Sequence, residues 1–405
     1  MKILQLCKKF PYPLKDGESI AVASLSRSLH ELGCEVSLLA MNTQKHFFSE
    51  NGALPSEMSH YKEALKVPVD NRVTPGGAFL NLFSRESYHI SRFVSSDFSS
   101  RLVQLLKANS YDLIQLETPY LAPYIPEIRR HSDALVSMRA HNVEHEIWNR
   151  IAENTAYFPK RWYLKHLAHK LFRYEKEQLQ HYDILVAITQ RDLDLFRKLG
   201  FQKKAVVAPI GIRPLDYQPD FDSFRRPLSL SFIGSMDWRP NLEGLQWFLG
   251  RVWKPLRKKY PALELHIAGR NTSESLKARL RGEHVIVHGE IPDAAEFING
   301  HSLMVVPLLS GSGMRAKILE GMALGKVVLT TSLGLEGIAA QPGREVLVAD
   351  SPKQFIEQIE YCLSQGPQLE NIGRQAHSFV LSQYDSLSIA RRLLEAYTAI
   401  TVEVA

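Results

Sequence analysis

The chain has 405 residues, of which 45% are hydrophobic and 23% are charged, and its formal net charge is +6. This length exceeds what one hydrophobic core usually holds, so we expect two or three domains. The modest positive charge admits phosphate ligands or an anionic membrane surface. Without a nucleic-acid-binding motif, it gives no reason to expect a nucleic-acid partner.

Cysteine usage and the N-terminus indicate a cytoplasmic protein. The three cysteines are far apart in sequence, which disfavours a disulfide framework or a zinc site and favours a reducing compartment. The apolar start at residues 1–7 is interrupted by Lys8 and Lys9 too early for a secretion signal. No apolar run approaches the ~18–20 residues of a transmembrane helix.

Strand and helix patterns alternate along the chain in two series. In the first, strands are expected at residues 2–7, 34–41, 111–116, 134–137, 184–189 and 205–208, and a first helix ends at a C-cap glycine, Gly33. In the second, strands are expected at 228–233, 263–268, 285–288, 303–308 and 326–331, with helices at about 241–260 and 314–324 and a helix start at Ser351. The alternation predicts an α/β fold with two parallel sheets, joined by a linker at 211–227.

Ligands of such sheets bind at the carboxyl ends of the strands, so the loops after strands are the places to search. The richest is 307–325, where Gly311 and Gly313 precede a helix that carries Arg315, Lys317 and Glu320. Glycines and a helix N-terminus suit a phosphate, the two cations add charge, and a carboxylate can hold a ribose diol. The alternative is a glycine-rich turn before an ion-paired surface helix.

Two further loops follow strands of the first series. Gly17 precedes the first helix, where a diphosphate could dock, but the absent Gly-x-Gly-x-x-Gly pattern disfavours a nicotinamide or flavin cofactor. The segment 139–145 gathers Arg139, His141 and Glu144. Its histidine spacing lacks the zincin order, which disfavours a metal. For the loop at Gly17 the alternative is a connecting loop without a ligand. For the segment 139–145 the alternative is a set of structural polar residues.

A basic helix is expected at 159–180. Residues 157–176 contain six Lys or Arg and one acid, Glu175, with Trp162 and Phe172 among them. This pattern fits a membrane surface or an anionic acceptor, or else an ordinary solvated helix face. The apolar segment 76–93 fits either a mobile loop on the acceptor side or core.

Residues 232–241, 311–325 and 331–337 resemble the family-4 retaining glycosyltransferases, and residues 13–17 and 139–144 resemble them more loosely. The resemblance implies the GT-B fold, with two Rossmann-like domains facing each other across a cleft. Residues 1–210 would form the acceptor-side domain, with 386–405 packing back on it, and residues 211–385 the nucleotide-sugar domain.

The resemblance also implies roles for individual residues. Glu320 would hold the donor ribose, Arg315 and Lys317 would act on the diphosphate, and His141 would lie by the donor sugar. The remaining donor-binding positions would be Gly17, Gly234, Arg239, Gly289, Ile291, Ser312, Gly313 and Met314.

Two departures from the family pattern shift this assignment. Ser312 replaces the first glutamate of the family's Glu-x7-Glu pair, and Ser235 and Pro240 replace an arginine and a lysine. The second departure moves the phosphate contacts toward Arg315, Lys317 and Arg239.

The expected function is transfer of a sugar from a nucleoside-diphosphate sugar to a glycan or lipid-linked acceptor in cell-envelope polysaccharide biosynthesis. Retention is implied by the resemblance, and no Asp-x-Asp motif is placed to hold a divalent metal. We expect no cofactor besides the donor itself, and a peripheral contact with the inner membrane face. The alternatives are a sugar-nucleotide epimerase and a degenerate, non-catalytic sugar-nucleotide-binding protein. A phosphorylase would need a pyridoxal-binding lysine, which is not identifiable.

Overall fold

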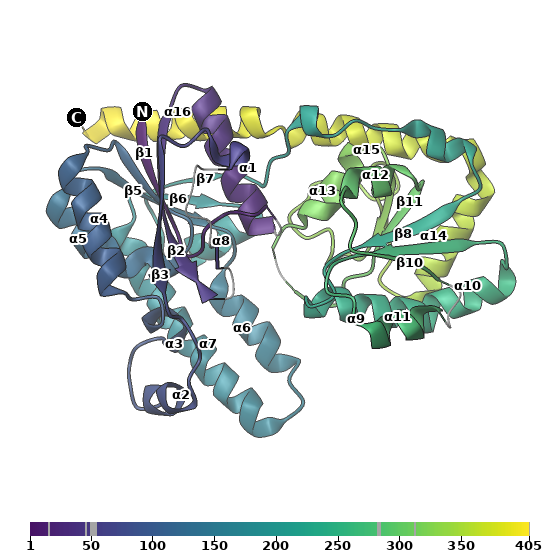
Figure 1. Cartoon of the computed structure of the whole chain (residues 1–405), viewed down its shortest axis with the longest axis horizontal. Helices are drawn as coiled ribbons and strands as arrows, with labels where there is room; N and C mark the ends of the chain where they lie inside the picture. The colour runs from purple at the N-terminus through teal and green to yellow at the C-terminus, as the bar shows by residue number, and fades with distance from the viewer. Residues whose placement is uncertain (15–16, 45–46, 49–54, 282–284, 312, 405) are drawn as a thin grey trace. The chain divides into compact units, whose positions relative to one another are not determined.

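The computed structural model describes residues 1–14, 17–44, 47–48, 55–281, 285–311 and 313–404. The chain forms two compact units (Figure 1). Unit 1 comprises Met1–Gly211 and Ser386–Ala405, and unit 2 comprises Ile212–Asp385. No helix among the described residues is both long enough and apolar enough to cross a membrane.

Unit 1 contains a seven-stranded parallel sheet in the order β3-β2-β1-β4-β5-β6-β7. Its strands are β1 Lys2–Cys7, β2 Glu35–Thr43, β3 Glu63–Val69, β4 Leu113–Leu116, β5 Leu135–Ala140, β6 Ile184–Ala187 and β7 Lys204–Val207. Its helices are α1 Gly17–Glu31, α2 Pro75–Asn81, α3 Tyr88–Ser91, α4 Ser96–Ala108, α5 Ile125–His131, α6 Glu144–Glu153, α7 Phe158–Gln178, α8 Gln190–Lys198 and α16 Ser386–Val404.

The predicted end of the first helix is confirmed. Gly33 has a φ of 86°, which only glycine adopts without strain, and the amide of Cys34 donates to the carbonyl of Leu29 at 3.0 Å. This closed turn reverses the chain directly into β2. The final helix, α16, packs on α1, where the hydroxyls of Ser28 and Ser386 lie 3.1 Å apart.

Unit 2 contains a six-stranded parallel sheet in the order β10-β9-β8-β11-β12-β13. Its strands are β8 Ser229–Ile233, β9 Glu264–Ala268, β10 Ile286–Gly289, β11 Leu303–Val306, β12 Val327–Thr330 and β13 Leu347–Val348. Its helices are α9 Arg239–Phe248, α10 Lys254–Lys259, α11 Glu274–Arg281, α12 Ala294–Asn299, α13 Ala316–Ala323, α14 Pro352–Gln365 and α15 Leu369–Gln383.

Several predicted boundaries need correction. The helix expected at 314–324 begins at Ala316, because Gly313 has a φ of 79° and Arg315 is extended. The helix expected at 241–260 begins at Arg239 and contains a π-helical turn at Leu249–Trp253 between α9 and α10. The start predicted at Ser351 is confirmed, since its side chain forms a capping box with Gln354.

Both sheets are Rossmann-like, which confirms the predicted fold class. In each, the first strand is central and the strand order reverses beside it, between β1 and β4 in unit 1 and between β8 and β11 in unit 2. Crevices at the carboxyl ends of strands open at such reversals. The loops after these four strands are therefore the places where a ligand is expected.

Candidate functional site

In unit 2, the loop after β8 and the helix after β11 meet at Asn241. The side chain of Asn241 donates to the carbonyl of Ser235 at 3.0 Å and accepts from the ammonium of Lys317 at 2.7 Å. A Cβ atom at Gly234 would lie 2.6 Å from the Asn241 amide nitrogen, so only glycine leaves room for this contact. Asn241 thus positions Lys317 at the point where the strand order reverses.

Lys317 is an unusual lysine. Its ammonium also lies 3.3 Å from the carbonyl of Ile233, at the end of β8. Burial, and then the nearby charge of Arg315, lower the pKa of Lys317 to about 7, while Glu320 opposes this shift. A buried amine held among protein carbonyls favours an incoming anion, because the anion stabilises its charged form.

The glycine-rich loop after β11 holds Arg315 before the helix. The Arg315 guanidinium donates to the carbonyl of Gly313 at 2.7 Å and lies 5.6 Å from the centre of the Trp238 ring. Gly311 has a φ of 104°, and a Cβ atom there would come within 3.0 Å of the guanidinium. Both glycines therefore let the loop fold closely around a buried cation.

Glu320 lies on α13, as predicted, and contacts a residue outside the expected motifs. Its carboxylate accepts from the Tyr217 hydroxyl at 3.4 Å. Burial raises the pKa of Glu320, whereas the bond from Tyr217 and the charge of Lys317 lower it. Tyr217 belongs to the segment 211–227 that the sequence marked only as a linker.

The other predicted donor-binding residues of unit 2 differ in their exposure. Arg239, the first residue of α9, is exposed and pairs with Glu243 at 2.5 Å, while Glu243 also accepts from Ser310 at 2.9 Å. Gly289 ends β10 with a φ of 72° and accepts from the amide of Gly269. Ile291 is half-buried after it and Met314 is buried, whereas Ser312 falls outside the described residues.

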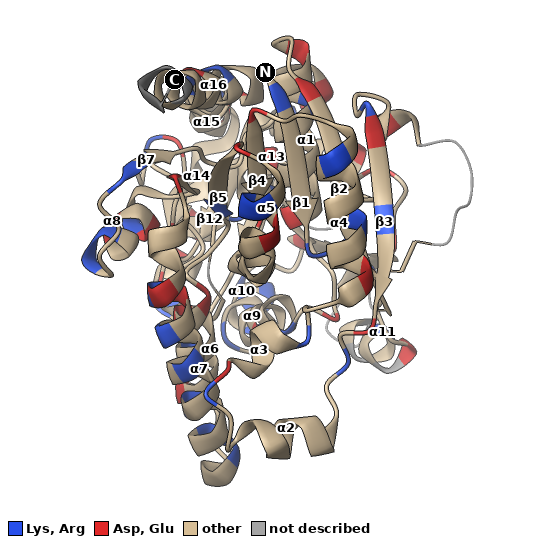
Figure 2. Cartoon of the chain, turned by 90° about the vertical axis from the view of Figure 1, so that its left-hand side faces the viewer, with Lys and Arg blue, Asp and Glu red and all other residues tan. Residues whose placement is uncertain are grey.

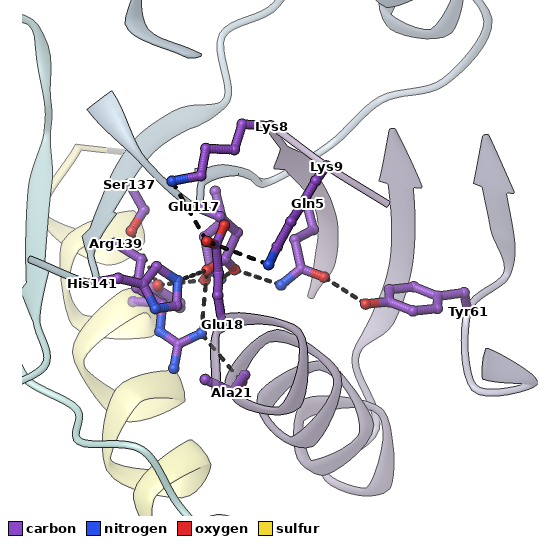
Figure 3. A network of polar contacts seen from close by, with 12 residues as sticks. Gln5, Lys8, Lys9, Glu18, Ala21, Tyr61, Glu117, Ser137, Arg139 and His141 are labelled. Carbon is purple, nitrogen blue, oxygen red and sulfur yellow. Dashed lines mark hydrogen bonds and ion pairs between the residues drawn. The ribbon is translucent and has the colours of Figure 1, made fainter. Parts of the chain in front are cut away.

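In unit 1, His141 belongs to a buried network centred on Glu117, directly after β4 (Figure 3). The Glu117 carboxylate lies 2.9 Å from Nε2 of His141 and 3.2 Å from Nη1 of Arg139. Gln5 and Gln115 donate their amides to the same carboxylate. A fully buried carboxylate at the reversal of the strand order thus holds the histidine in place.

Electrostatics keep Glu117 ionised. Burial alone would raise its pKa, but the charge of Arg139 and the hydrogen bond from His141 outweigh burial and hold the pKa at about 2. An ionised carboxylate only accepts hydrogen bonds, so Nε2 of His141 carries a proton. In the neutral ring, Nδ1 is then an acceptor.

Beyond His141, the residues Glu144 and His145 join this segment to Tyr120 and to α7. His145 bonds to Glu175 of α7 at 2.7 Å, and the amides of Glu144 and His145 donate to the same carboxylate, which fixes the start of α6. Glu144 is buried and accepts from the Tyr120 hydroxyl at 3.2 Å, and burial raises the pKa of Glu144. In the described parts of the chain, no group of three or more His, Cys, Asp or Glu side chains is placed so that it could hold a metal ion.

Gly17 is the first residue of α1, and the space where its Cβ atom would lie is open. The neighbouring acid Glu18 pairs with Lys8 at 3.5 Å and Lys9 at 3.7 Å, and these three residues appear beside Glu117 in Figure 3. Glu18 places a negative charge at the start of α1.

Sequence reasoning missed three residues of these clusters: Glu117, Tyr217 and Asn241. Glu117 follows the predicted strand 111–116 directly, so the rule applied to the other loops would have selected it. Asn241 lies in the segment 232–241 that carries the resemblance but was given no role. Tyr217 gave no comparable signal, because it reaches the site through a partner 103 residues away in sequence.

Two family models match the chain. The model described as Glycosyltransferase Family 4 matches residues 16–214, and the model described as Glycosyl transferases group 1 matches residues 227–365. An uncharacterized 44.6 kDa protein in the cps region of Klebsiella pneumoniae is 24% identical over 310 residues, which cover 72% of this chain and 75% of that protein.

Solved structures with the same fold cover nearly the whole chain. Sucrose-phosphate synthase from Thermosynechococcus elongatus has a TM-score of 0.74 at 14% identity, with all of both chains covered. Anabaena HepE in complex with UDP-glucose has a TM-score of 0.66 at 14% identity, covering 98% of this chain and all of that one. A TarM mutant of S. aureus in complex with fondaparinux, α-GlcNAc-glycerol and UDP has a TM-score of 0.67 at 10% identity, covering 98% and 99%. The two units have the GT-B fold.

Proposed function

Because this chain is an enzyme that belongs to the family-4, group 1 glycosyltransferases, we propose that it transfers a sugar from a nucleoside-diphosphate sugar to a glycan or lipid-linked acceptor, with retention and without a divalent metal. The observation that carries the proposal is the cluster of Asn241, Lys317, Arg315 and Glu320 at the strand-order reversal of unit 2. In this proposal, the cluster binds the donor.

The chemical task is to let a nucleoside diphosphate depart while the sugar becomes cation-like. Arg315 and Lys317 would stabilise the charge that develops on the diphosphate, with the free amides at the start of α13. At about 4 Å and an effective dielectric of about 20, each cation contributes on the order of 4 kcal/mol before desolvation. These protein cations make a divalent metal unnecessary for the leaving group. Glu320 would accept hydrogen bonds from the donor ribose.

His141 would act on the sugar through its free acceptor. Glu117 holds the Nε2 side of the ring, so Nδ1 can accept a hydrogen bond from a sugar hydroxyl. Glu117 itself would be a positioning residue. Gly17 would approach the diphosphate, and Gly289 and Ile291 would lie against the base, as the family resemblance implies.

The relatives favour particular donors and acceptors for a first assay. HepE binds UDP-glucose, and the TarM mutant was solved with UDP and a glycan. The relative in a cps region supports our expectation of a role in cell-envelope polysaccharide biosynthesis. We place the reaction in the cytoplasm, at the inner membrane face.

The testing experiment is a thermal-shift panel of nucleoside diphosphates and their sugars, followed by product analysis with the donor that stabilises most. We expect one nucleotide class to raise the melting temperature and its sugar to be transferred with an unchanged anomeric configuration. Turnover should persist with excess chelator. Complete inhibition that magnesium reverses would contradict the metal-free mechanism, and epimerised donor without transfer would contradict the transferase.

A further inference from the structure

An exposed apolar and basic surface on unit 1 comprises residues of α2 and α7 and residues next to these helices. Six large apolar side chains on it are between 57% and 79% exposed: Phe79, Leu80, Phe83, Tyr157, Phe158 and Trp162. Lys160, Arg161 and Lys165 belong to the same first turns of α7 as Phe158 and Trp162, and we call these nine residues the α2–α7 surface. Figure 2 shows the blue cations of α7 beside the tan helix α2.

The surface is held in shape by contacts beneath it. The Lys170 ammonium is buried and donates to the backbone carbonyl of Asn81 and, at 3.2 Å, to its side chain. The Tyr163 hydroxyl donates to the carbonyl of Ala78 at 3.4 Å. Lys170 therefore serves the fold and does not add to the basic face that the sequence predicted.

The apolar members of this surface are not needed for the core of unit 1. Leu164, Leu167 and Leu171 line the opposite side of α7 and are buried. Trp162 stacks on His166, with ring centres 5.9 Å apart, and Phe79 meets Phe83 edge-on. Such a concentration of exposed aromatic residues marks an interaction site.

The position of the surface relates it to the candidate site. Helix α2 follows the carboxyl end of β3, and α6 and α7 follow the carboxyl end of β5. The Glu117–His141 network lies at the carboxyl ends of β4 and β5. The surface and the network thus occupy the same end of the unit 1 sheet (Figure 1).

We propose that the α2–α7 surface docks on an anionic lipid bilayer, with its aromatic and leucine side chains at the headgroup boundary and its cations on the lipid phosphates. Trp and Tyr favour this boundary, and each Lys or Arg near an anionic leaflet strengthens binding. A second copy of the chain is a poorer occupant, because a symmetric interface would bring the same cations together. The inference rests on the proposed function in one respect, namely that a lipid-linked acceptor would be presented at this end of unit 1.

The test is sedimentation of the full chain with vesicles of phosphatidylglycerol and phosphatidylcholine, compared with vesicles of phosphatidylcholine alone. We expect binding only to the anionic vesicles, weakened by high salt. A Lys160→Ala/Arg161→Ala/Lys165→Ala variant should lose on the order of a hundredfold in partitioning. A Phe79→Ser/Leu80→Ser/Phe83→Ser variant should lose at least tenfold.

Matched controls separate the effect of the α2–α7 surface on vesicle binding from the effect of net charge. Lys107, Arg130 and Lys198 are exposed at the ends of α4, α5 and α8, which lead into the amino ends of strands. The Lys107→Ala/Arg130→Ala/Lys198→Ala variant has the same net charge as the first variant and should bind like the wild type. Leu80→Ser should weaken binding, whereas Leu215→Ser, at an equally exposed leucine in unit 2, should not.

Equal binding to both vesicle types, binding to neither, or an equal loss in the control variant would overturn the proposal. So would a dimer, measured by light scattering, that the Phe79→Ser/Leu80→Ser/Phe83→Ser variant abolishes while the wild type binds no vesicle. The thermal shift caused by the donor is read on every variant and should not change. A wild type without any donor shift would count against the proposed function and leave the vesicle result intact.

Discussion

Glu320 lies one turn beyond Lys317 on α13, and its carboxylate accepts a hydrogen bond from the Tyr217 hydroxyl of the linker segment. We expect Glu320→Ala to weaken donor binding and turnover by about ten- to a hundredfold, because a charge-assisted hydrogen bond contributes roughly 1.5–3 kcal/mol. Calorimetric titration with the donor and initial rates would measure both. The conservative Glu320→Gln variant should recover part of the loss, and wild-type donor affinity in a folded Glu320→Ala protein would exclude the ribose contact.

Lys317 gives a second prediction, because burial and Arg315 lower its pKa to about 7. The charged amine binds the diphosphate, so the KM for the donor should rise as the pH increases above about 7, where free Lys317 loses its proton. Lys317→Arg should flatten this rise, since arginine stays charged. Lys317→Ala should lower kcat more than it raises KM. A KM that does not change between pH 6 and 9 in the wild type would contradict the role of Lys317.

Individual site residues were predictable where a residue with suitable chemistry also lay directly after a predicted strand. Arg315, Lys317 and Glu320 carry the right chemistry directly after a buried strand, and they lie around one centre in unit 2. Glu117 is equally well placed, directly after the predicted strand 111–116, but was not selected. Its importance lies in the four side chains that converge on it from β1, β4 and β5, and a linear pattern does not show that convergence.

At the scale of elements, the buried central strands and the edge strands β7 and β10 were predictable, whereas the edge strands β3 and β13 were not. β3 is only partly buried along Glu63–Lys66 and contains Pro68, so its sequence lacks the apolar run of the interior strands. β13 has two residues and gives no periodic signal. Helix starts depended on backbone details such as the positive φ of Gly313, which moves the first turn of α13 to Ala316.

The strands of unit 2 also carry a histidine cluster that predicts sensitivity to acid. His301, before β11, bonds to Ser229 at 2.9 Å and stacks on His266 of β9, which contacts His288 of β10 at 3.0 Å. Burial, then His266, His288, Lys326 and Arg226, lower the pKa of His301 to about 3.

The sign of the effect follows from proton uptake. Below pH 6.5 the unfolded chain protonates His301 and the folded protein does not, so the free energy of unfolding falls from about pH 6.5 toward pH 3. His301→Gln should flatten this fall in urea denaturation measured at several pH values. A substitution at the half-buried His131, outside this cluster, is the control, and identical pH slopes for His301→Gln and the wild type would show that His301 is not responsible.

At the scale of the whole molecule, the alternation of strand and helix patterns was sufficient to predict two parallel sheets. The reversal of strand order beside β1 and β8 follows from right-handed crossovers once the first strand of each series is central. Sequence patterns did not indicate which side chains of distant elements pair across a sheet. Tyr397 is an example, because it lies in the last helix and reaches the centre of the unit 1 sheet.

The Tyr397 hydroxyl donates to Gln115 at 2.8 Å and lies 3.0 Å from the Ser137 hydroxyl, and the side chain is fully buried. Gln115 in turn bonds to Glu117, so the last helix supports the network around His141. Tyr397→Phe leaves the Gln115 oxygen without this partner, which should cost about 1–3 kcal/mol and lower the Tm by several degrees. Tyr361→Phe, at a tyrosine that is 43% exposed on α14, should leave the Tm within a degree or so of the wild type. Donor affinity should change little in both variants, because neither tyrosine belongs to the cluster of Asn241, Arg315, Lys317 and Glu320 in unit 2. Equal melting temperatures for the two variants would mean that α16 does not stabilise unit 1 through this hydroxyl.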